Sequence, residues 1–531
     1  MRNSLDQAFW LRSIKSVVLS NAALAFAILL GWWPAVFLTV AWVYYSLINF
    51  KHRGFKNTFF AILVTNFCFM IIPTWWFTRI EPAGWLRTIG PFSPSTWLVI
   101  VLAMICIFSS LLISILICSV IYTVRLGDIK IPKFLYPLAF AFGMLWIEIL
   151  RAYLFSLFIH AKTLPIEPMW NIYSVGSTLT EFWPLKYWFS FVGMWGVSFF
   201  SYLIIASING KFNRNLRFVI ISSLLILISL PLIIGKVKSE QPSQLINAYA
   251  VSLDQENQLG TEFEKSINSS NSGQPALIVL PEYSNISSSP SQLPTQNLRD
   301  KFAHLIKTRP LLQITNTEAI GFNDKTYVES YVLDSDNTKT NQKVKKFLVP
   351  GGEYIIRWVQ WIFARLDPIA AIEFEKNRGR VVVNQNDITY EKSNPPKDLP
   401  HITTIACSTI LTPYEVNDEI KKGGEIVSVN VSYEQFQKTS SYSKIVARFS
   451  KVIALSTKRT VVVGALKGPA IITNINGSQL ISNESIKQEV ELNKKSSFYT
   501  RIGDKKIIMA LSITSLMLLV FGAKYSLKQR W

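Results

Sequence analysis

Apolar stretches long enough, or nearly long enough, to cross a bilayer recur along this chain and constrain its fold more than any other feature. A membrane-spanning helix needs about 20 apolar residues. Such stretches run at about 14–31, 35–50, 57–77, 96–124, 134–159, 187–208, 218–234 and 507–523. The first has no small-residue cleavage site and another stretch follows at once, so we expect a retained helix rather than a signal peptide. The sequence therefore predicts a polytopic membrane protein with about eight spans.

The composition agrees with a membrane protein. Half of the 531 residues are hydrophobic and only 17% are charged. The net charge of +20 could suggest nucleic acid, but residues 240–500 hold 29 Lys and Arg against 27 Asp and Glu, a net of +2 (29 − 27). The excess positive charge lies in the membrane part, so we expect a membrane and no nucleic acid as a partner.

The basic residues also predict a topology. Seven spans, a globular insert and one last span place both termini on one side and the insert on the other. Fifteen Lys and Arg flank the spans on the side of the termini, against nine on the side of the insert. Because Lys and Arg favour the cytoplasmic side, we expect cytoplasmic termini in a cell membrane. We expect a membrane domain at 1–238, an outward-facing domain at 239–503, and a last helix with a cytoplasmic tail at 504–531.

The segment between about 240 and 500 has the pattern of a mixed α/β domain. Short β-branched runs alternate with polar stretches there, and helical periodicity appears near 295–307 and 440–455. The expected strands are 245–253, 276–281, 327–333, 402–407, 426–432, 460–465 and 469–474. This alternation predicts an α/β domain or a layered α-β-β-α domain.

Three reactive side chains follow or precede short apolar runs in this domain. Glu282 comes after Leu280-Pro281, Lys345 precedes Phe347-Leu348-Val349-Pro350, and Cys407 ends the run Ile402 to Ala406. If they converge, the carboxylate can take the thiol proton, the ammonium can stabilise the thiolate and the oxyanion, and the sulfur can carry an acyl group. Alone, each residue is more often a solvated charge or a core thiol.

The other cysteines suggest no further chemistry. Cys68, Cys106 and Cys118 fall inside apolar stretches, where a thiol is usually a small core residue. No group of Cys and His residues has the spacing of zinc ligands, so we expect no metal. His401 lies six residues before Cys407, about 20 Å away along a strand at ~3.3 Å per residue, and we discount a Cys-His pair.

Together, the order of these motifs resembles the carbon–nitrogen hydrolase (nitrilase) superfamily and, with spans on both sides, its membrane branch, the apolipoprotein N-acyltransferases. In that family a Glu follows Leu-Pro, a Lys stands just before a Leu-Val-Pro-x-Gly-Glu stretch, and a Cys ends a strand. These positions are Glu282, Lys345 and Cys407 here, and Glu353 matches a further carboxylate of the family site. The resemblance implies a nitrilase-like α-β-β-α sandwich and no cofactor.

The resemblance extends into the membrane region. Residues 146–151 resemble a family helix with Trp, Glu and Arg, and residues 193–199 resemble a Gly-x-Tyr-Gly-Val-Ser-Phe stretch. Glu148 and Arg151 are either a structural ion pair on one helix face or part of an access route for lipid or peptide. The aromatic and basic segment 354–366, with Trp358 and Trp361, is either a lid at the acyl-chain access route or an amphipathic packing helix.

Two departures from the family pattern affect the expected site. The family continues its Cys with Tyr-Glu, whereas this chain has Ser408-Thr409, and the family's Asn-Asp-x-Trp-Phe-Gly arm appears only as residues 432–436. Glu415, eight residues beyond Cys407, could partly substitute for the missing carboxylate. The departures bear more on substrate fit than on the nucleophile.

The resemblance implies a two-step acyl transfer. An acyl chain would pass from a phospholipid to Cys407 as a thioester, and then to the α-amino group of the diacylglyceryl-cysteine of a lipoprotein. We expect a monomer with these two substrates as partners. A membrane-bound amidase of the same superfamily and a non-catalytic lipid-binding scaffold are the alternatives.

Overall fold

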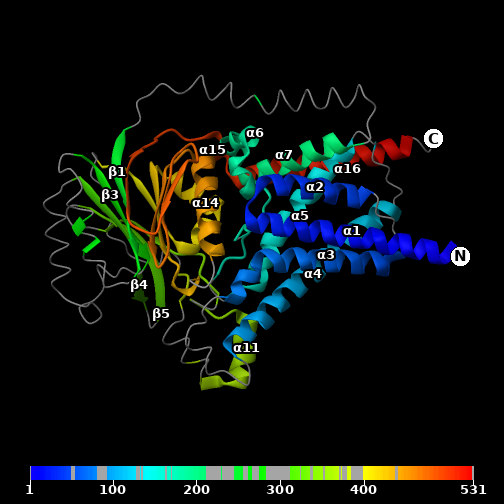
Figure 1. Ribbon diagram of the computed structural model, residues 1–531, viewed down its shortest axis with the longest axis horizontal. Coiled ribbons are helices and arrows are strands. Elements are labelled where there is room, and N and C mark those ends of the chain that lie inside the picture. Colours follow the sequence, from blue (N-terminus) through cyan, green and yellow to red (C-terminus); the bar gives the residue numbers. More distant parts are fainter. Residues whose placement is uncertain are drawn as a thin grey trace.

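A helical bundle and a β sandwich lie at opposite ends of the long axis of the protein (Figure 1). The computed structural model describes residues 2–48, 54–79, 93–126, 132, 135–161, 164–168, 170–210, 229, 244–254, 261–262, 264–265, 274–282, 311–322, 325–334, 339–350, 353–369, 372, 380–383, 399–436 and 440–528. The two parts meet along one end of the bundle, and the candidate site lies near that junction.

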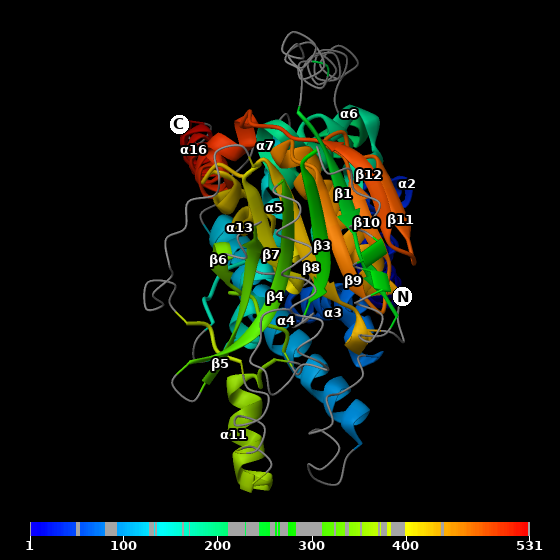
Figure 2. The same ribbon diagram turned by 90° about the vertical axis from the view of Figure 1, so that its left-hand side faces the viewer.

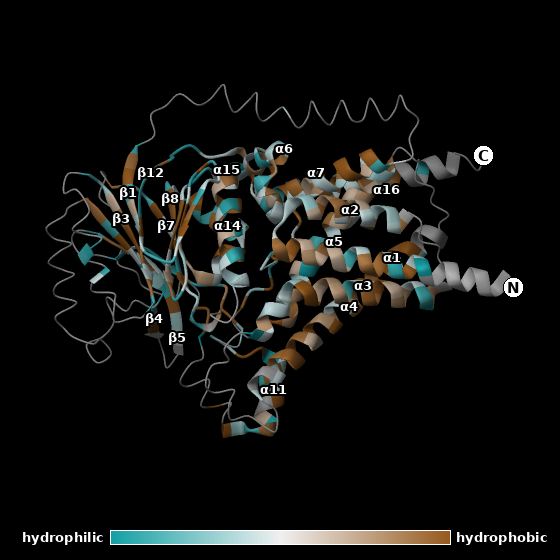
Figure 3. Cartoon of the chain, viewed as in Figure 1, coloured by the Kyte–Doolittle hydropathy of each residue, from teal (hydrophilic) through white to brown (hydrophobic). Residues whose placement is uncertain are grey.

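The bundle is built from long apolar helices. They are α1 (Arg2–Leu30), α2 (Trp33–Ile48), α3 (Gly54–Thr74), α4 (Pro94–Leu126), α5 (Tyr136–Phe158) and α7 (Phe189–Asn209), joined by α16 (Asp504–Lys528) beside α7. Short helices η1 (Trp75–Arg79), η4 (Gly176–Glu181) and α6 (Trp183–Lys186) connect them. Hydrophobic residues predominate in the bundle (Figure 3).

The predicted number of spans is not confirmed. Within the described ranges, five helices are long and apolar enough to cross a membrane, namely α1, α3, α4, α5 and α7, and α2 is a shorter apolar helix. The span predicted at 218–234 lies outside the described residues. The structure therefore supports a helical membrane part, but it does not establish that the number of membrane spans is eight.

In the described part of the domain, two six-stranded sheets form the sandwich. The first has the order β12-β1-β3-β4-β5-β6, and the second the order β11-β10-β9-β8-β7 with β2 beside β9. Their bounds are β1 (Leu245–Ala250), β2 (Ser252–Leu253), β3 (Ala276–Glu282), β4 (Leu312–Phe322), β5 (Lys325–Leu333), β6 (Lys339–Val344), β7 (Ile402–Ala406), β8 (Ile426–Ser432), β9 (Val461–Leu466), β10 (Ala470–Thr473), β11 (Gln479–Ser482) and β12 (Ile486–Glu491). Figure 2 views the sandwich from the side of the first sheet.

The central strands are parallel and pack face to face across the sandwich. β1, β3 and β4 run parallel in the first sheet, and β7, β8 and β9 run parallel in the second. Leu277 and Val279 of β3 are buried in one apolar cluster with Val462 of β9. At Gly464 a Cβ would lie 2.4 Å from the carbonyl oxygen of Val279, so only glycine lets β3 and β9 approach this closely. These contacts bring the ends of strands from both sheets together.

Helices cover the second sheet on the side of the bundle. They are η7 (Cys407–Leu411), α13 (Pro413–Ile420), η8 (Glu434–Phe436), α14 (Ser441–Thr457) and α15 (Phe498–Ile502). α14 lies between the second sheet and the membrane helices (Figure 1). It buries residues at helical spacing, among them Ile445, Phe449 and Val452. The helix predicted at 295–307 lies outside the described residues, so the described layers are bundle-side helices, sheet and sheet.

The sandwich caps the ends of two membrane helices. The last carbonyls of a helix have no partner within it. Arg448 of α14 donates to the carbonyl oxygen of Ile28 in α1. At the end of α5, Trp358 Nε1 donates to the Phe158 carbonyl at 2.9 Å, and the Tyr354 hydroxyl donates to the Ile159 carbonyl at 2.7 Å. Both helices thus end at the sandwich, while α1 begins and α16 ends at the far end of the bundle (Figure 1).

The Gly-rich stretch 193–199 of α7 has a packing role. Gly193 has a φ of 62°, and a Cβ there would lie 2.2 Å from the ring of Tyr499 in α15. One helical turn on, the Ser198 hydroxyl oxygen accepts a hydrogen bond from the Gly176 amide at 2.7 Å. The stretch therefore fixes α7 to α15 on one side and to η4 on the other.

Candidate active site

The structure brings the three predicted strand-end residues into one buried cluster. Glu282 is the last residue of β3, Lys345 directly follows β6, and Cys407 directly follows β7. Lys345 Nζ donates to Glu282 Oε1 at 2.9 Å and to Glu353 Oε1 at 2.8 Å. The Lys345 backbone amide donates to the Val328 carbonyl of β5 at 2.8 Å, which extends the sheet to this residue. Rigid strands thus aim all three side chains at one point.

Lys345, and not its neighbours, lies at this point. The side chain of Lys345 is 1% exposed. Lys343 forms ion pairs with Glu415 and Glu419, and Lys346 forms one with Glu415 at 2.9 Å. Lys343 and Lys345 would share one face in a regular strand, so alternation alone does not account for their different partners.

The backbone of Cys407 is strained. Its φ is 36°, in the left-handed region that non-glycine residues rarely adopt. It follows the extended Ala406 and begins the short helix η7, so the chain turns sharply at the sulfur. Sγ lies 3.5 Å from the Tyr442 hydroxyl of α14, and the thiol also interacts with the Glu282 carboxylate.

Burial and neighbouring charges set the protonation of the cluster. Burial raises the pKa of Cys407 to about 12, and the negative charge of Glu282 adds to this effect while Lys345 opposes it. Burial also raises the pKa of Glu282, although Lys345 opposes it. Burial disfavours the ammonium of Lys345, but Glu282 and Glu353 outweigh it and raise the Lys345 pKa. These shifts favour a thiol at Cys407 and an ammonium at Lys345, and they make the Glu282 carboxylate a stronger proton acceptor.

Glu353 completes the surroundings of the ammonium. Its Oε1 accepts from Lys345, and its Oε2 accepts the Val349 amide at 2.7 Å. The backbone amide of Glu353 donates in turn to the Val349 carbonyl at 2.9 Å. These bonds fix the carboxylate, so Glu353 holds Lys345 in place between two acceptors.

Aromatic rings form the wall of the site on the side of the membrane bundle. The Tyr442 ring stacks on Phe436 with centroids 4.1 Å apart, and Trp76 of η1 lies 5.6 Å from Tyr442. Trp76 stacks on Phe77 at 4.2 Å, and Phe77 stacks on Trp170 at 5.0 Å. Trp76, Phe436 and Tyr442 are each at most 3% exposed. The wall thus joins the sandwich to the apolar interior of the bundle.

Glu415 does not replace the carboxylate that the sequence lacks after Cys407. Its Oε1 lies 2.9 Å from Lys346 Nζ and 3.3 Å from Lys343 Nζ. Burial opposes its charge, but these two lysines hold its pKa below the ordinary value. The suggested substitution is therefore wrong, since this carboxylate is committed to a separate ion-pair group.

Ser408, at the position where the resemblance predicts a tyrosine, has a structural contact. Its hydroxyl donates to the carbonyl oxygen of Phe347, two residues after Lys345. This bond ties the turn at Cys407 to the segment that carries the ammonium, and it leaves the site without a side chain from position 408.

Glu148 and Arg151 are buried in α5 but do not pair directly. Glu148 Oε1 accepts from the Val175 amide at 3.0 Å and from the Tyr202 hydroxyl. Arg151 Nη2 donates to Asn66 Oδ1 at 2.9 Å, and no ion pair joins the two side chains among the described residues. The ion-pair interpretation is therefore corrected: each side chain ties α5 to other segments of the bundle. A role in substrate access stays a prediction.

Trp358 and Trp361 lie on α11 (Arg357–Leu366), which extends away from the sandwich and the bundle (Figure 1). Trp358 is held at the end of α5 by its indole bond. Trp361 is 58% exposed, with the Arg365 guanidinium 3.6 Å from its ring centroid. An exposed Trp beside an Arg suits a membrane interface, and the predicted lid stays a prediction.

Sequence reasoning missed Tyr433, Tyr442 and Trp76. Tyr433 directly follows β8, within the segment 432–436, but no role was assigned to it. Tyr442 lies on α14 and Trp76 on η1, where no strand end marks them. His401 and Cys407 lie at opposite ends of β7, which agrees with discounting a Cys-His pair. No group of three His, Cys, Asp or Glu residues suited to a metal ion occurs in the described ranges.

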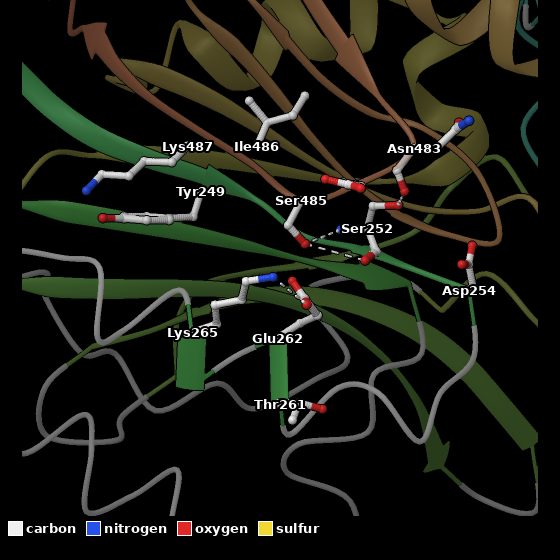
Figure 4. Close-up of a pocket in the computed structure, with 11 residues that line it drawn as sticks. Tyr249, Ser252, Asp254, Thr261, Glu262, Lys265, Asn483, Ser485, Ile486 and Lys487 are labelled. Carbon is white, nitrogen blue, oxygen red and sulfur yellow. Dashed lines mark hydrogen bonds and ion pairs between the residues drawn. The ribbon is translucent and has the colours of Figure 1, made fainter.

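Among the cavities of the described residues, two lie away from this cluster. One of about 560 Å³ lies beside β1, β2 and the start of β12, where Tyr249, Ser252 and Lys487 line it (Figure 4). The other, of about 300 Å³, lies between helices of the bundle and is lined by Asn66 and Arg151 among mostly apolar residues. Neither is lined by Cys407, whose side chain is enclosed by its neighbours.

Comparison with known proteins found similarity only among solved structures. No family model matches the chain, and no curated protein matches it. A cysteine-to-alanine variant of an amidase of Nesterenkonia AN1, from the nitrilase superfamily, is 11% identical, with a TM-score of 0.34, and the match covers 51% of this chain and 98% of that chain. An amidase from Nesterenkonia sp. is 11% identical, with a TM-score of 0.33, over 51% of this chain and 97% of that chain.

Proposed function

We propose that this protein is a membrane acyltransferase of the carbon–nitrogen hydrolase type. It takes an acyl chain from a phospholipid onto Cys407 as a thioester and transfers it to the amino group of the diacylglyceryl-cysteine of a lipoprotein. The observation that carries the proposal is the buried Glu282–Lys345–Cys407 cluster, walled by Trp76 of the membrane part. A nucleophile placed there can meet a substrate that stays embedded in lipid.

The first half-reaction uses each member of the cluster. As Cys407 Sγ attacks the ester carbonyl carbon, its proton passes to Glu282 and the carbonyl oxygen gains negative charge. Lys345 stabilises this charge and that of the sulfur. When the carbon–oxygen bond breaks, Glu282 returns the proton to the leaving glycerol oxygen. Because its pKa is raised, Glu282 can both accept the proton from the thiol and return it to the leaving oxygen.

The second half-reaction reverses the roles. The amine of the acceptor attacks the thioester carbon, loses a proton to Glu282, and releases the Cys407 sulfur, which regains a proton. Water must stay out, because it would hydrolyse the thioester. The enclosed wall of Trp76, Phe436 and Tyr442 supports transfer over hydrolysis.

The proposed orientation places the sandwich outside the cytoplasm. The distribution of Lys and Arg supports it, and α1 and α16 both extend to the far end of the bundle, as that topology requires (Figure 1). In this arrangement the site lies at the end of the bundle that faces the outer side of the membrane, where the proposed lipoprotein substrate would be anchored.

The test is a transfer assay on the full chain in phospholipid vesicles whose acyl chains are isotopically labelled. With a synthetic diacylated lipopeptide present, we expect a labelled triacylated peptide, and none from Cys407→Ala. Labelled free fatty acid without labelled peptide would instead favour a hydrolase of the amidase type. Neither product would favour the scaffold alternative and overturn the proposal.

A further inference from the structure

A tyrosine of α14 lies against the reactive sulfur. The Tyr442 hydroxyl is 3.5 Å from Cys407 Sγ, and its side chain is 1% exposed. Stacking on Phe436 and the contact with Trp76 hold the ring in place. A phenol fixed at this distance can donate a hydrogen bond to a thiolate, which lowers the pKa of Cys407.

A second tyrosine lies beside the first with its hydroxyl unused. Tyr433 follows β8, and its amide donates to the Leu466 carbonyl at 2.8 Å. Its ring centroid is 5.6 Å from that of Tyr442, and the ring packs on Gly468, where a Cβ would lie 2.2 Å from ring carbon Cδ2. Tyr433 is 3% exposed, and its hydroxyl has no hydrogen-bond partner among the described residues.

A buried hydroxyl without a partner calls for an explanation, because nearly all buried polar groups have one. Burial raises the pKa of Tyr433, and the negative charge of the nearby Cys407 sulfur raises it further. Tyr433 is therefore close enough to Cys407 to respond to its charge. A group that binds at Cys407 with an oxygen atom would supply the missing acceptor. An acyl ester has such an oxygen on the carbon that the sulfur attacks.

We propose that Tyr442 and Tyr433 form a two-hydroxyl site for the acyl group on Cys407. Tyr442 holds the sulfur, and Tyr433 donates to the acyl carbonyl oxygen. This inference rests on the proposed function and deepens it. When the sulfur–carbon bond forms, the thiol proton goes to Glu282 and the carbonyl electron pair moves to the oxygen, which Tyr433 and Lys345 stabilise. When the carbon–oxygen ester bond breaks, that pair returns and Glu282 protonates the leaving oxygen.

Such a pair also compensates for the residues that follow the cysteine. Position 408 carries a serine whose hydroxyl is bound to the Phe347 carbonyl. The phenol groups come instead from Tyr433, directly after β8, and from Tyr442 of α14.

Two reactions of the full-length protein in detergent separate the two roles. Alkylation of Cys407 by iodoacetamide, followed on its peptide by mass spectrometry, forms a sulfur–carbon bond and releases iodide, so no charge develops on a carbonyl oxygen. Acylation by p-nitrophenyl butyrate, followed by the release of p-nitrophenol, does place charge there. Tyr249→Phe is the matched control, because Tyr249 is also 3% exposed with an unpartnered hydroxyl among the described residues but lies in the first sheet.

For Tyr433→Phe we expect acylation slowed about 100-fold, as for loss of an oxyanion donor, with alkylation unchanged. For Tyr442→Phe we expect alkylation slowed about 2- to 10-fold, as for loss of one hydrogen bond, and a shift of its pH profile to higher pH. Tyr249→Phe should change neither rate. Acylation by Tyr433→Phe at the rate of the control would overturn the inference. If p-nitrophenyl butyrate acylates the wild-type protein at the expected rate but phospholipid does not, the proposed function is contradicted, whereas the two-hydroxyl site is not.

Discussion

Replacing Lys345 by Met should destabilise the sandwich strongly. The ammonium is 1% exposed and holds two carboxylates, Glu282 at 2.9 Å and Glu353 at 2.8 Å. Removing one partner of a buried ion pair costs about 3–5 kcal/mol, because a buried charge is left without compensation. With about 2–4 °C of melting temperature per kcal/mol for a domain of this size, we expect a fall of about 6–20 °C.

Thermal unfolding of the detergent-purified protein, followed by intrinsic fluorescence, measures this change. Lys467→Met is the control, because Lys467 pairs with Glu434 at 2.6 Å on the surface, where an ion pair contributes about 0–1 kcal/mol. Adding Glu353→Gln to Lys345→Met should recover part of the loss, since one uncompensated carboxylate is removed. If the melting temperature of Lys345→Met equals that of Lys467→Met, Lys345 does not compensate two buried carboxylates as described.

Four further predictions concern the site and its surroundings. Because the pKa of Cys407 is raised to about 12, its alkylation rate should rise about tenfold per pH unit from pH 7 to 10; a plateau near the ordinary thiol pKa of about 8.5 would contradict this. Glu282→Gln should abolish acylation of Cys407 at neutral pH and leave the melting temperature less changed than Lys345→Met does. Gly193→Ala should lower protein yield and melting temperature, because a Cβ there meets a tyrosine ring at 2.2 Å. Changing Trp358 and Trp361 to Ser should slow acylation by long-chain donors more than by p-nitrophenyl butyrate; equal loss would argue against a lid.

Much of the fold could be predicted because it follows from local patterns. The β-branched runs at β3, β7, β8 and β9 gave strands with nearly correct bounds, and the predicted helix at 440–455 is α14. β4, β6, β11 and β12 were missed. Thr315, Asn316 and Glu318 interrupt the apolar pattern of β4, and in β12 charged residues predominate. Their strand conformation depends on pairing with β3 and β1, which are distant in sequence.

The cluster of Glu282, Lys345 and Cys407 could be predicted because each residue stands at a strand end, where chain direction fixes its position. Tyr442 could not, since it lies on the buried face of an amphipathic helix and looks like an ordinary core residue. Its contact with Cys407 depends on how α14 packs on the second sheet. The partners of Glu415 and Arg151 likewise come from other segments, and the sequence has no local signal for them.

The proposed mechanism requires Cys407 to carry the acyl chain as a thioester, and intact-protein mass spectrometry can detect this adduct. Protein incubated with phosphatidylethanolamine vesicles should gain the mass of one acyl chain, lose it in neutral hydroxylamine, and regain the starting mass when a diacylated lipopeptide is added. Cys407→Ala should show no adduct. An unmodified Cys407 in the wild-type protein, with vesicles of every headgroup and chain length tried, would contradict the account.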